Sequence, residues 1–141
     1  MTKNLENEGL SSIVDNYQLF YVDLWGVVHN GVHLHDEAIK ALKGITNKGK
    51  DYVLLTNAPR PNNAVKSFLE KLGMEKEIRD HVFTSGEAAL TYLKKNLLDK
   101  SFFHIGSLRD FDLFKDFEKM KSDQIEKSDY ILCTGLFDNH H

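Results

Sequence analysis

The stretch Tyr21-Val-Asp-Leu-Trp-Gly-Val-Val-His-Asn-Gly31 carries the strongest structural signal in the chain. It overlaps an apolar run, Gln18-Leu-Phe-Tyr-Val-Asp23, that is rich in aromatic and β-branched residues and ends at a carboxylate. Such a run, followed by a glycine-containing turn, predicts a β-strand that is buried on both faces. A carboxylate at the end of a buried strand is placed to attack a phosphorus atom. The simpler alternative is an Asp that caps the following turn.

Helical and strand patterns alternate after this stretch. Residues 36–48 carry apolar side chains at helical spacing, with Asp36 as the predicted N-cap. Residues 52–56 form a second apolar run, typical of a buried strand, and Pro61 is suited to the first position of the helix that follows it. Because short links join these elements, the pattern predicts an α/β fold with a parallel sheet.

The last part of the chain continues the pattern more weakly. Thr84 and Glu87 have the spacing of a capping box ahead of a helix that runs to about residue 95. Three further segments are predicted from apolar runs: strands over 101–106 and 130–135, and a helix over 109–121.

Polar residues follow two of the predicted strands at the point where each strand ends. Asp23 ends the first strand, and Thr56 and Asn57 end the second. In a parallel sheet the reactive groups collect at the carboxyl ends of the strands. We therefore expect these residues to meet in space, although they are far apart in the sequence.

Four motifs, taken in order, resemble one family. They are Asp23-Leu-Trp-Gly-Val-Val-His-Asn-Gly31, Ala38-Ile-Lys-Ala-Leu42, Leu55-Thr-Asn-Ala-Pro-Arg60 and Phe83-Thr-Ser-Gly-Glu-Ala-Ala89. The set resembles the haloacid dehalogenase-like (HAD) hydrolases, and among them the class IIA, NagD-like branch. The resemblance implies that residues 1–82 are the N-terminal part of a Rossmann-like parallel core. It implies that residues 83–141 are the junction to an inserted α/β cap and the beginning of that cap.

The resemblance also implies roles for individual residues. Asp23 would be the nucleophile and a ligand of Mg²⁺, and the backbone carbonyl of Trp25 would be a second metal ligand. The Thr56 hydroxyl would bind the transferring phosphoryl group, which Asn57 would help to orient. The implied activity is Mg²⁺-dependent hydrolysis of a small phosphorylated metabolite through an aspartyl-phosphate.

The chain departs from the family pattern two residues after Asp23. HAD phosphatases usually carry a second Asp there, which protonates the leaving oxygen and then activates water, but this chain has Trp25. His29, His33 and His35 are candidates to replace it, the simpler interpretation being that they are solvated loop histidines. A zinc site at these histidines lacks a partner cluster in the sequence.

A second departure opens an alternative function. The family's downstream Lys and acidic metal motif have no counterpart in these 141 residues, so we expect a truncated hydrolase that is inactive alone. The alternative is a non-catalytic fragment that acts as a binding or assembly module. A response-regulator-like receiver is less well supported, because its acidic pair and late Lys are missing. An incomplete sheet would expose an edge, which predicts possible self-association.

Composition limits the partners that we expect. The formal net charge is −3, which gives no electrostatic support for nucleic-acid binding. Neither a signal peptide nor a membrane span is evident, and the single cysteine suits a reducing compartment, so a cytoplasmic location is expected. Cys133 lies in an apolar run, which predicts a buried structural thiol.

Overall fold

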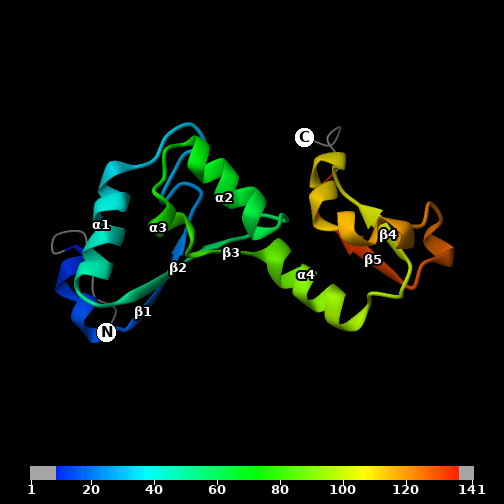
Figure 1. Ribbon diagram of the computed structural model, residues 1–141, viewed down its shortest axis with the longest axis horizontal. Coiled ribbons are helices and arrows are strands. Elements are labelled where there is room, and N and C mark those ends of the chain that lie inside the picture. The colour runs from blue at the N-terminus through cyan, green and yellow to red at the C-terminus, as the bar shows by residue number, and fades with distance from the viewer. Residues whose placement is uncertain (1–8, 137–141) are drawn as a thin grey trace. The chain divides into compact units, whose positions relative to one another are not determined.

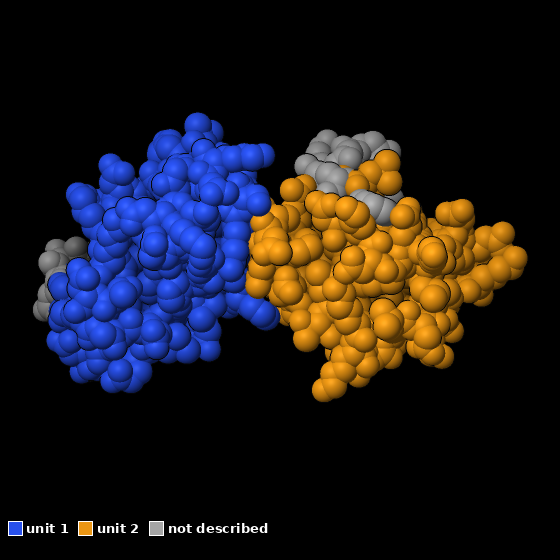
Figure 2. Space-filling view, in the orientation of Figure 1, with its two compact units in different colours: residues 1–56, 66–83 blue, residues 57–65, 84–141 orange. Residues whose placement is uncertain are grey.

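The computed structural model describes residues 9–136. The chain divides into two compact units, Met1–Thr56 with Lys66–Phe83 and Asn57–Val65 with Thr84–His141 (Figure 2). The division into a core over residues 1–82 and a cap that begins at residue 83 remains a prediction. No helix in the described part of the chain has the length and apolar character needed to cross a bilayer.

Helices and strands alternate along residues 10–84 (Figure 1). The strands are β1 (Leu19–Asp23), β2 (Asp51–Thr56) and β3 (Val82–Thr84), and the helices are α1 (Asp36–Asn47), α2 (Asn62–Lys71) and α3 (Lys76–Arg79). Two 3₁₀ turns, η1 (Leu10–Ser12) and η2 (Val14–Asn16), precede β1. The sheet order is β1-β2-β3, and β1 and β2 run parallel. The predicted α/β fold with a parallel sheet is therefore confirmed.

The first unit buries the apolar faces of its helices and of its central strand. On α1 the buried residues are Leu42 and Ile45, which the periodicity predicted. The predicted N-cap is wrong, since His35 holds that position with an extended backbone and makes no side-chain capping bond. Asp36 is instead the first helical residue, where its negative charge still favours the positive end of the helix dipole.

The prediction that β1 is buried on both faces is also wrong. Its side chains alternate, and Leu19 and Tyr21 point to one face with 43% and 69% of their surface exposed. Leu55 on β2, which shares that face by register with Asp23, is 42% exposed. β1 is the edge of its sheet, and within residues 9–136 too little packs on this face to cover it.

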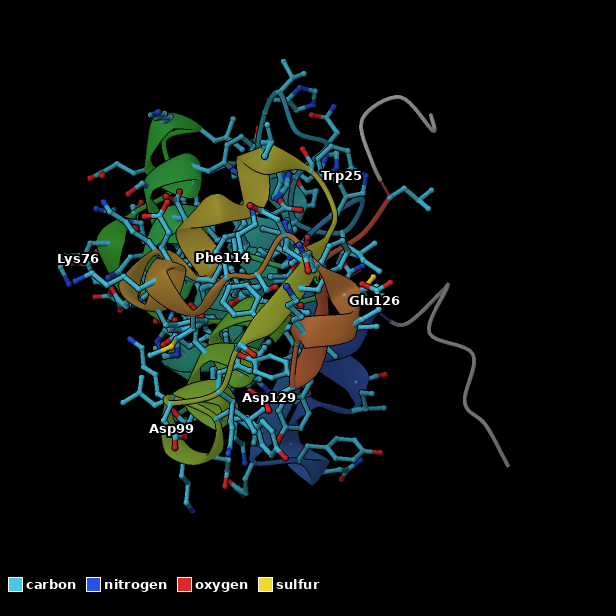
Figure 3. All side chains as sticks on the ribbon, turned by 90° about the vertical axis from the view of Figure 1, so that its right-hand side faces the viewer. Trp25, Lys76, Asp99, Phe114, Glu126 and Asp129 are labelled. Carbon is cyan, nitrogen blue, oxygen red and sulfur yellow. The ribbon has the colours of Figure 1, made fainter. Side chains whose placement is uncertain are left out.

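The second unit is built on α4 (Ser85–Asn96) and on a parallel pair of strands, β4 (Phe102–Ile105) and β5 (Tyr130–Cys133). Phe102 is fully buried and packs edge-on against Phe114, with ring centroids 5.3 Å apart, and against Phe117 at 5.9 Å. Phe114 is labelled in Figure 3. Both strands lie where apolar runs predicted them.

Two predictions for this unit are wrong. The segment predicted as one helix over 109–121 forms the 3₁₀ helices η3 (Leu108–Leu113) and η4 (Lys115–Met120), and Phe117 within it has non-helical φ and ψ of −128° and 28°. This geometry lets Phe114 and Phe117 both reach Phe102. A third 3₁₀ turn, η5 (Ile125–Lys127), precedes β5. Cys133 is exposed, because side chains alternate along β5 and its neighbour Leu132 takes the buried side.

Candidate active site

The strand register brings two predicted site residues to one edge of the first sheet. Asp23 is the last residue of β1 and lies opposite Leu55 on β2, directly before Thr56. The Asp23 carboxylate accepts a hydrogen bond from the Leu24 N–H through Oδ1 at 2.8 Å, and the residue is exposed. Asp23 therefore caps the next turn through one oxygen while the residue stays exposed, so the capping interpretation does not exclude the nucleophile interpretation.

The loop after Asp23 is a tight backbone turn with buried anchors. Leu24 and Val28 are 1% and 0% exposed. The Leu24 carbonyl accepts hydrogen bonds from the N–H groups of Val28 and His29, and the Gly26 N–H donates to the His29 carbonyl at 2.8 Å. Gly26 has a φ of +76°, a left-handed conformation that glycine adopts without steric cost. The turn thus places residue 25 directly beside the end of β1.

His29 is buried inside this loop, 4% exposed, so the interpretation as a solvated histidine is wrong for this residue. Its Nδ1 accepts a hydrogen bond from the Gly31 N–H at 3.0 Å. Burial lowers the pKa of His29, the nearby His35 lowers it further, and the Asp23 carboxylate partly opposes both. The missed signal is the Val-Val-His order, in which His29 follows a buried Val28.

The two other candidate histidines occupy different environments. His33 is exposed, as predicted for a solvated loop residue, and His35 is half-buried. Their rings meet edge-on, with centroids 5.6 Å apart. No group of three or more His, Cys, Asp or Glu residues is placed to hold a metal ion within the described segment.

Trp25, labelled in Figure 3, lies two residues after Asp23, where the family resemblance leads us to expect an acid, and its side chain is 64% exposed. The indole meets the His29 ring edge-on at 5.5 Å between centroids. A Cβ on Gly31 would lie 2.6 Å from the indole Cη2, so the indole lies over Gly31. An indole N–H donates hydrogen bonds but does not exchange protons at neutral pH, so Trp25 does no acid or base work.

The segment from Asn57 to Arg60 belongs to the second unit, where the start of α4 holds its backbone. The Ser85 hydroxyl donates to the Asn57 carbonyl at 2.9 Å. The Gly86 N–H donates to the Ala58 carbonyl at 3.1 Å, and the Thr84 hydroxyl donates to the Arg60 carbonyl at 2.5 Å. This support was not predicted, although the string Phe83-Thr-Ser-Gly-Glu-Ala-Ala89 that supplies it stood out in the sequence.

The loop after β1 offers oxygen ligands of the kind that a hard cation prefers, but only a few of them. The described loop offers the Asp23 carboxylate and the Trp25 carbonyl, and no other described residue donates a hydrogen bond to that carbonyl. Mg²⁺ prefers six oxygen ligands and commonly takes one or two carboxylates together with water and substrate phosphate. These residues therefore fit a magnesium ion that is shared with a bound phosphate.

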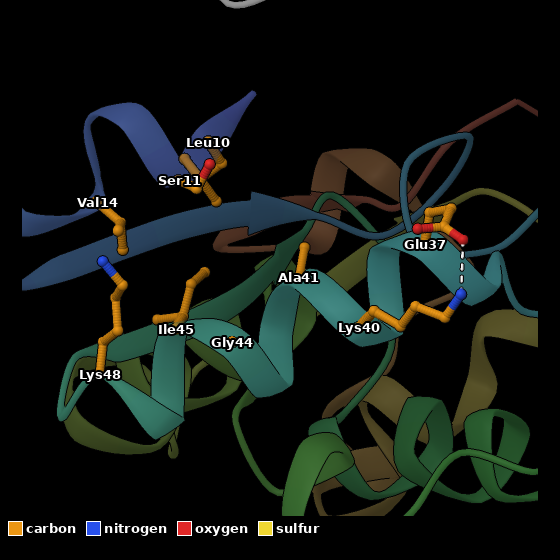
Figure 4. Close-up of a pocket in the computed structure, with 9 residues that line it drawn as sticks. All are labelled: Leu10, Ser11, Val14, Glu37, Lys40, Ala41, Gly44, Ile45 and Lys48. Carbon is orange, nitrogen blue, oxygen red and sulfur yellow. Dashed lines mark hydrogen bonds and ion pairs between the residues drawn. The ribbon is translucent and has the colours of Figure 1, made fainter. Parts of the chain in front are cut away.

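An apolar groove of the first unit is lined by other residues. It has a volume of about 330 Å³ and lies between η1, η2 and α1 (Figure 4). Its walls include Val14 and Ile45, and an ion pair of 2.7 Å joins Lys40 to Glu37 beside it. None of the predicted site residues lines this groove.

A known family profile matches the part of the chain that carries these motifs. The sequence profile of the haloacid dehalogenase-like hydrolases matches residues 20–118. The chain belongs to this HAD-like hydrolase family. The match contains Asp23, Trp25, Thr56 and Asn57, so the resemblance predicted from the motifs is confirmed.

This HAD-like chain is similar to one named phosphatase and to one solved hydrolase. It is 36% identical over 110 residues to phosphoglycolate phosphatase 2 of Arabidopsis thaliana, covering 72% of this chain and 35% of that protein. The structure matches a HAD-like hydrolase from Brucella suis with a TM-score of 0.77 and 32% identity, over 92% of this chain and 46% of that one. The chain thus spans less than half the length of either relative.

One more solved protein shares the fold of this chain. A glycerol phosphate phosphatase from Mycobacterium tuberculosis, solved in complex with magnesium, matches with a TM-score of 0.62 and 20% identity. It covers 88% of this chain and 38% of the other. The HAD-like fold of this chain therefore agrees with that of a protein solved with a metal.

Proposed function

We propose that this chain supplies the nucleophile and part of the phosphate-binding site of a Mg²⁺-dependent phosphatase that hydrolyses a small phosphorylated metabolite. The observation that carries the proposal is the β1–β2 register, which sets Asp23 beside the end of β2, where Thr56 follows. Phosphatase names among the relatives support the class of reaction. The Mg²⁺ requirement, the substrate and the roles of individual residues are parts of the proposal.

The proposed chemistry begins at the Asp23 carboxylate. One carboxylate oxygen attacks the phosphorus, so that an aspartyl-phosphate forms as the bond from phosphorus to the substrate oxygen breaks. The Thr56 hydroxyl donates a hydrogen bond to a phosphoryl oxygen, and Asn57 orients the group. Water then attacks the phosphorus, the bond from phosphorus to the Asp23 oxygen breaks, and inorganic phosphate leaves as the Asp23 carboxylate is restored. Asp23 and the Trp25 carbonyl would hold Mg²⁺, which when bound neutralises charge between carboxylate and phosphate.

Trp25 makes one feature of this reaction distinctive. Because the side chain two residues after the nucleophile cannot protonate the leaving oxygen, esters of acidic alcohols should react well and esters of ordinary alcohols poorly. Para-nitrophenyl phosphate, whose leaving phenolate is stable without a proton, is therefore the suitable first substrate.

The test is an assay of the complete protein with para-nitrophenyl phosphate and Mg²⁺, comparing the wild type with Asp23→Asn. We expect the wild type to turn over and to show a phosphate adduct by acid quenching and intact-mass spectrometry, and we expect the variant to show neither. Asp15→Asn is the matched control, because Asp15 is an exposed carboxylate that pairs with Lys48. Full activity in Asp23→Asn would remove Asp23 from the nucleophile role.

The second candidate function is a non-catalytic binding or assembly module. Trp25 in place of an acid, together with the exposed apolar face of β1, favours it. It predicts that the chain binds inorganic phosphate or associates with itself while the complete protein shows no turnover. Turnover of the complete protein separates the two functions, and light scattering over a concentration series tests self-association, which would raise the mass with concentration.

A further inference from the structure

The ring of His29 is enclosed by two aromatic side chains of the first unit. It meets Trp25 edge-on at 5.5 Å with an interplanar angle of 88°, and it meets Phe68 of α2 at 5.5 Å with an angle of 68°. Trp25 lies in the loop after β1 and Phe68 on a helix, so the imidazole links the loop to the body of the unit. The ring itself is buried, whereas the indole that it contacts is largely exposed.

Hydrogen bonds fix His29 from three directions. Its N–H donates to the Leu24 carbonyl at 3.1 Å, its carbonyl accepts from Gly26, and its Nδ1 accepts from the Gly31 N–H. An Nδ1 that accepts a hydrogen bond carries no proton, so the neutral ring has its proton on Nε2. His29 therefore spans both ends of the loop, from the residue after Asp23 to Gly31.

We propose that His29 is a positioning residue, whose imidazole holds the Trp25 indole and the Gly31 backbone so that the loop after Asp23 keeps one conformation before any ligand binds. This deepens the proposed function, since the same loop carries the Trp25 carbonyl. An exposed indole free to rotate would cover or uncover the end of β1. A clamped indole keeps the loop after Asp23 in one conformation, so that no ordering cost is added when a ligand binds.

A direct acid or base role for His29 fits the geometry less well. Its Nδ1 is occupied by the Gly31 N–H, and its ring is enclosed between Trp25 and Phe68. A group that exchanges protons with a substrate must reach the substrate, whereas His29 is 4% exposed. The structure therefore assigns His29 to the support of Trp25.

Trp25 is the only tryptophan of the chain, so its fluorescence reports this loop alone. Two variants separate the two contacts of His29. His29→Phe keeps an aromatic ring and removes the acceptor, whereas His29→Asn keeps an acceptor and removes the ring. His33→Asn is the control, since His33 lies in the same loop but is exposed.

We expect time-resolved fluorescence anisotropy to show a rigid indole in the wild type and in His33→Asn, with a fast local component appearing in His29→Asn. We expect the Gly31 amide to exchange its hydrogen about tenfold faster in His29→Phe, because its acceptor is gone. Unchanged indole motion and unchanged exchange in both variants would overturn the proposal, as would equal changes in His33→Asn.

One measurement needs no variant and guards against a variant that fails to fold. The imidazole nitrogen shifts of the wild-type chain at mildly alkaline pH report the tautomer, and we expect the proton of His29 on Nε2. A proton on Nδ1 would overturn the proposal. None of these readouts depends on turnover, so an inactive protein with a clamped Trp25 would contradict the phosphatase proposal and leave this one standing.

Discussion

Replacing Gly86 by Ala should destabilise the protein, although alanine favours helices. Gly86 is buried near the start of α4. A Cβ there would lie 2.5 Å from the carbonyl carbon of Arg60 and closer still to the backbone N and O of that residue. Backbone atoms cannot rotate away as a side-chain end does, so the segment from Asn57 to Arg60 must move. The same movement would strain the hydrogen bonds that Ser85 and Gly86 make to it.

The expected magnitude follows from opposing effects. Overpacking costs about 1–3 kcal/mol, and one strained hydrogen bond adds about 1 kcal/mol, while the helix propensity of alanine returns at most about 1 kcal/mol. We expect Gly86→Ala to lose about 2 kcal/mol of unfolding free energy. Gly44→Ala is the matched control, because Gly44 lies within α1 and an added Cβ would have no described atom within 4 Å beyond its chain neighbours and its own helix backbone. That control should gain about 0.5–1 kcal/mol.

The measurement is urea unfolding of both variants and the wild type, followed by far-ultraviolet circular dichroism. With an ordinary dependence on urea, the midpoint of Gly86→Ala should fall by about 1 M, while that of Gly44→Ala rises slightly. The result that refutes the reasoning is a Gly86→Ala midpoint at or above that of the wild type. A shift of the same sign in both variants would show that helix propensity decides and contact with Arg60 does not.

Three further expectations concern the second unit and are checked by the same unfolding assay. Phe102→Ala should lower the unfolding free energy by about 3–5 kcal/mol, because it empties a site with no exposed surface. Ile131→Ala on the adjacent strand, where the side chain is 51% exposed, should lower it much less. Equal losses in the two variants would contradict the packing. Thr84→Val should cost about 1–2 kcal/mol because it removes the oxygen that caps α4, and Thr84→Ser should restore most of this; failure of Ser to rescue would rule out the cap. Burial lowers the pKa of His104, with Lys121 adding to the shift and Asp110 opposing it, so its stability contribution is complete above the ordinary histidine pKa and is lost as pH falls through the lowered value. The decline in stability on acidification from about pH 7 should therefore be shallower in His104→Gln than in the wild type, and an identical slope would contradict the assignment.

Residues with a strong local signal were predicted well from the sequence. The apolar positions of α1, the strand ends at Asp23 and Thr56, and the helix start at Thr84 all follow from short-range patterns of spacing and capping. A parallel sheet then brings strand ends together without any knowledge of individual contacts. The family motifs independently predicted the same fold and the same site residues.

The wrong predictions have a common cause: each concerns a residue whose environment depends on what packs beside it. An apolar strand reads as fully buried whether or not a second layer covers it, which is why Tyr21 and Cys133 were predicted wrongly. A histidine in a polar loop reads as solvated, whereas His29 is buried by Phe68 of a distant helix. Phe117 reads as helical by spacing but adopts the geometry that reaches Phe102.

The start of α4 has a consequence for the order in which the chain folds. In an ordinary capping box the Glu87 side chain would return to the Thr84 N–H. Here Asn62 stands between them, since its Oδ1 accepts from the Thr84 N–H at 2.9 Å and its own N–H donates to Glu87 at 2.9 Å. A helix of this length is marginal in isolation, and part of its first turn is completed only when a residue from much earlier in the chain arrives. We therefore expect the first turn of α4 to form late, after that loop has closed, and a peptide of α4 alone to begin with a frayed end.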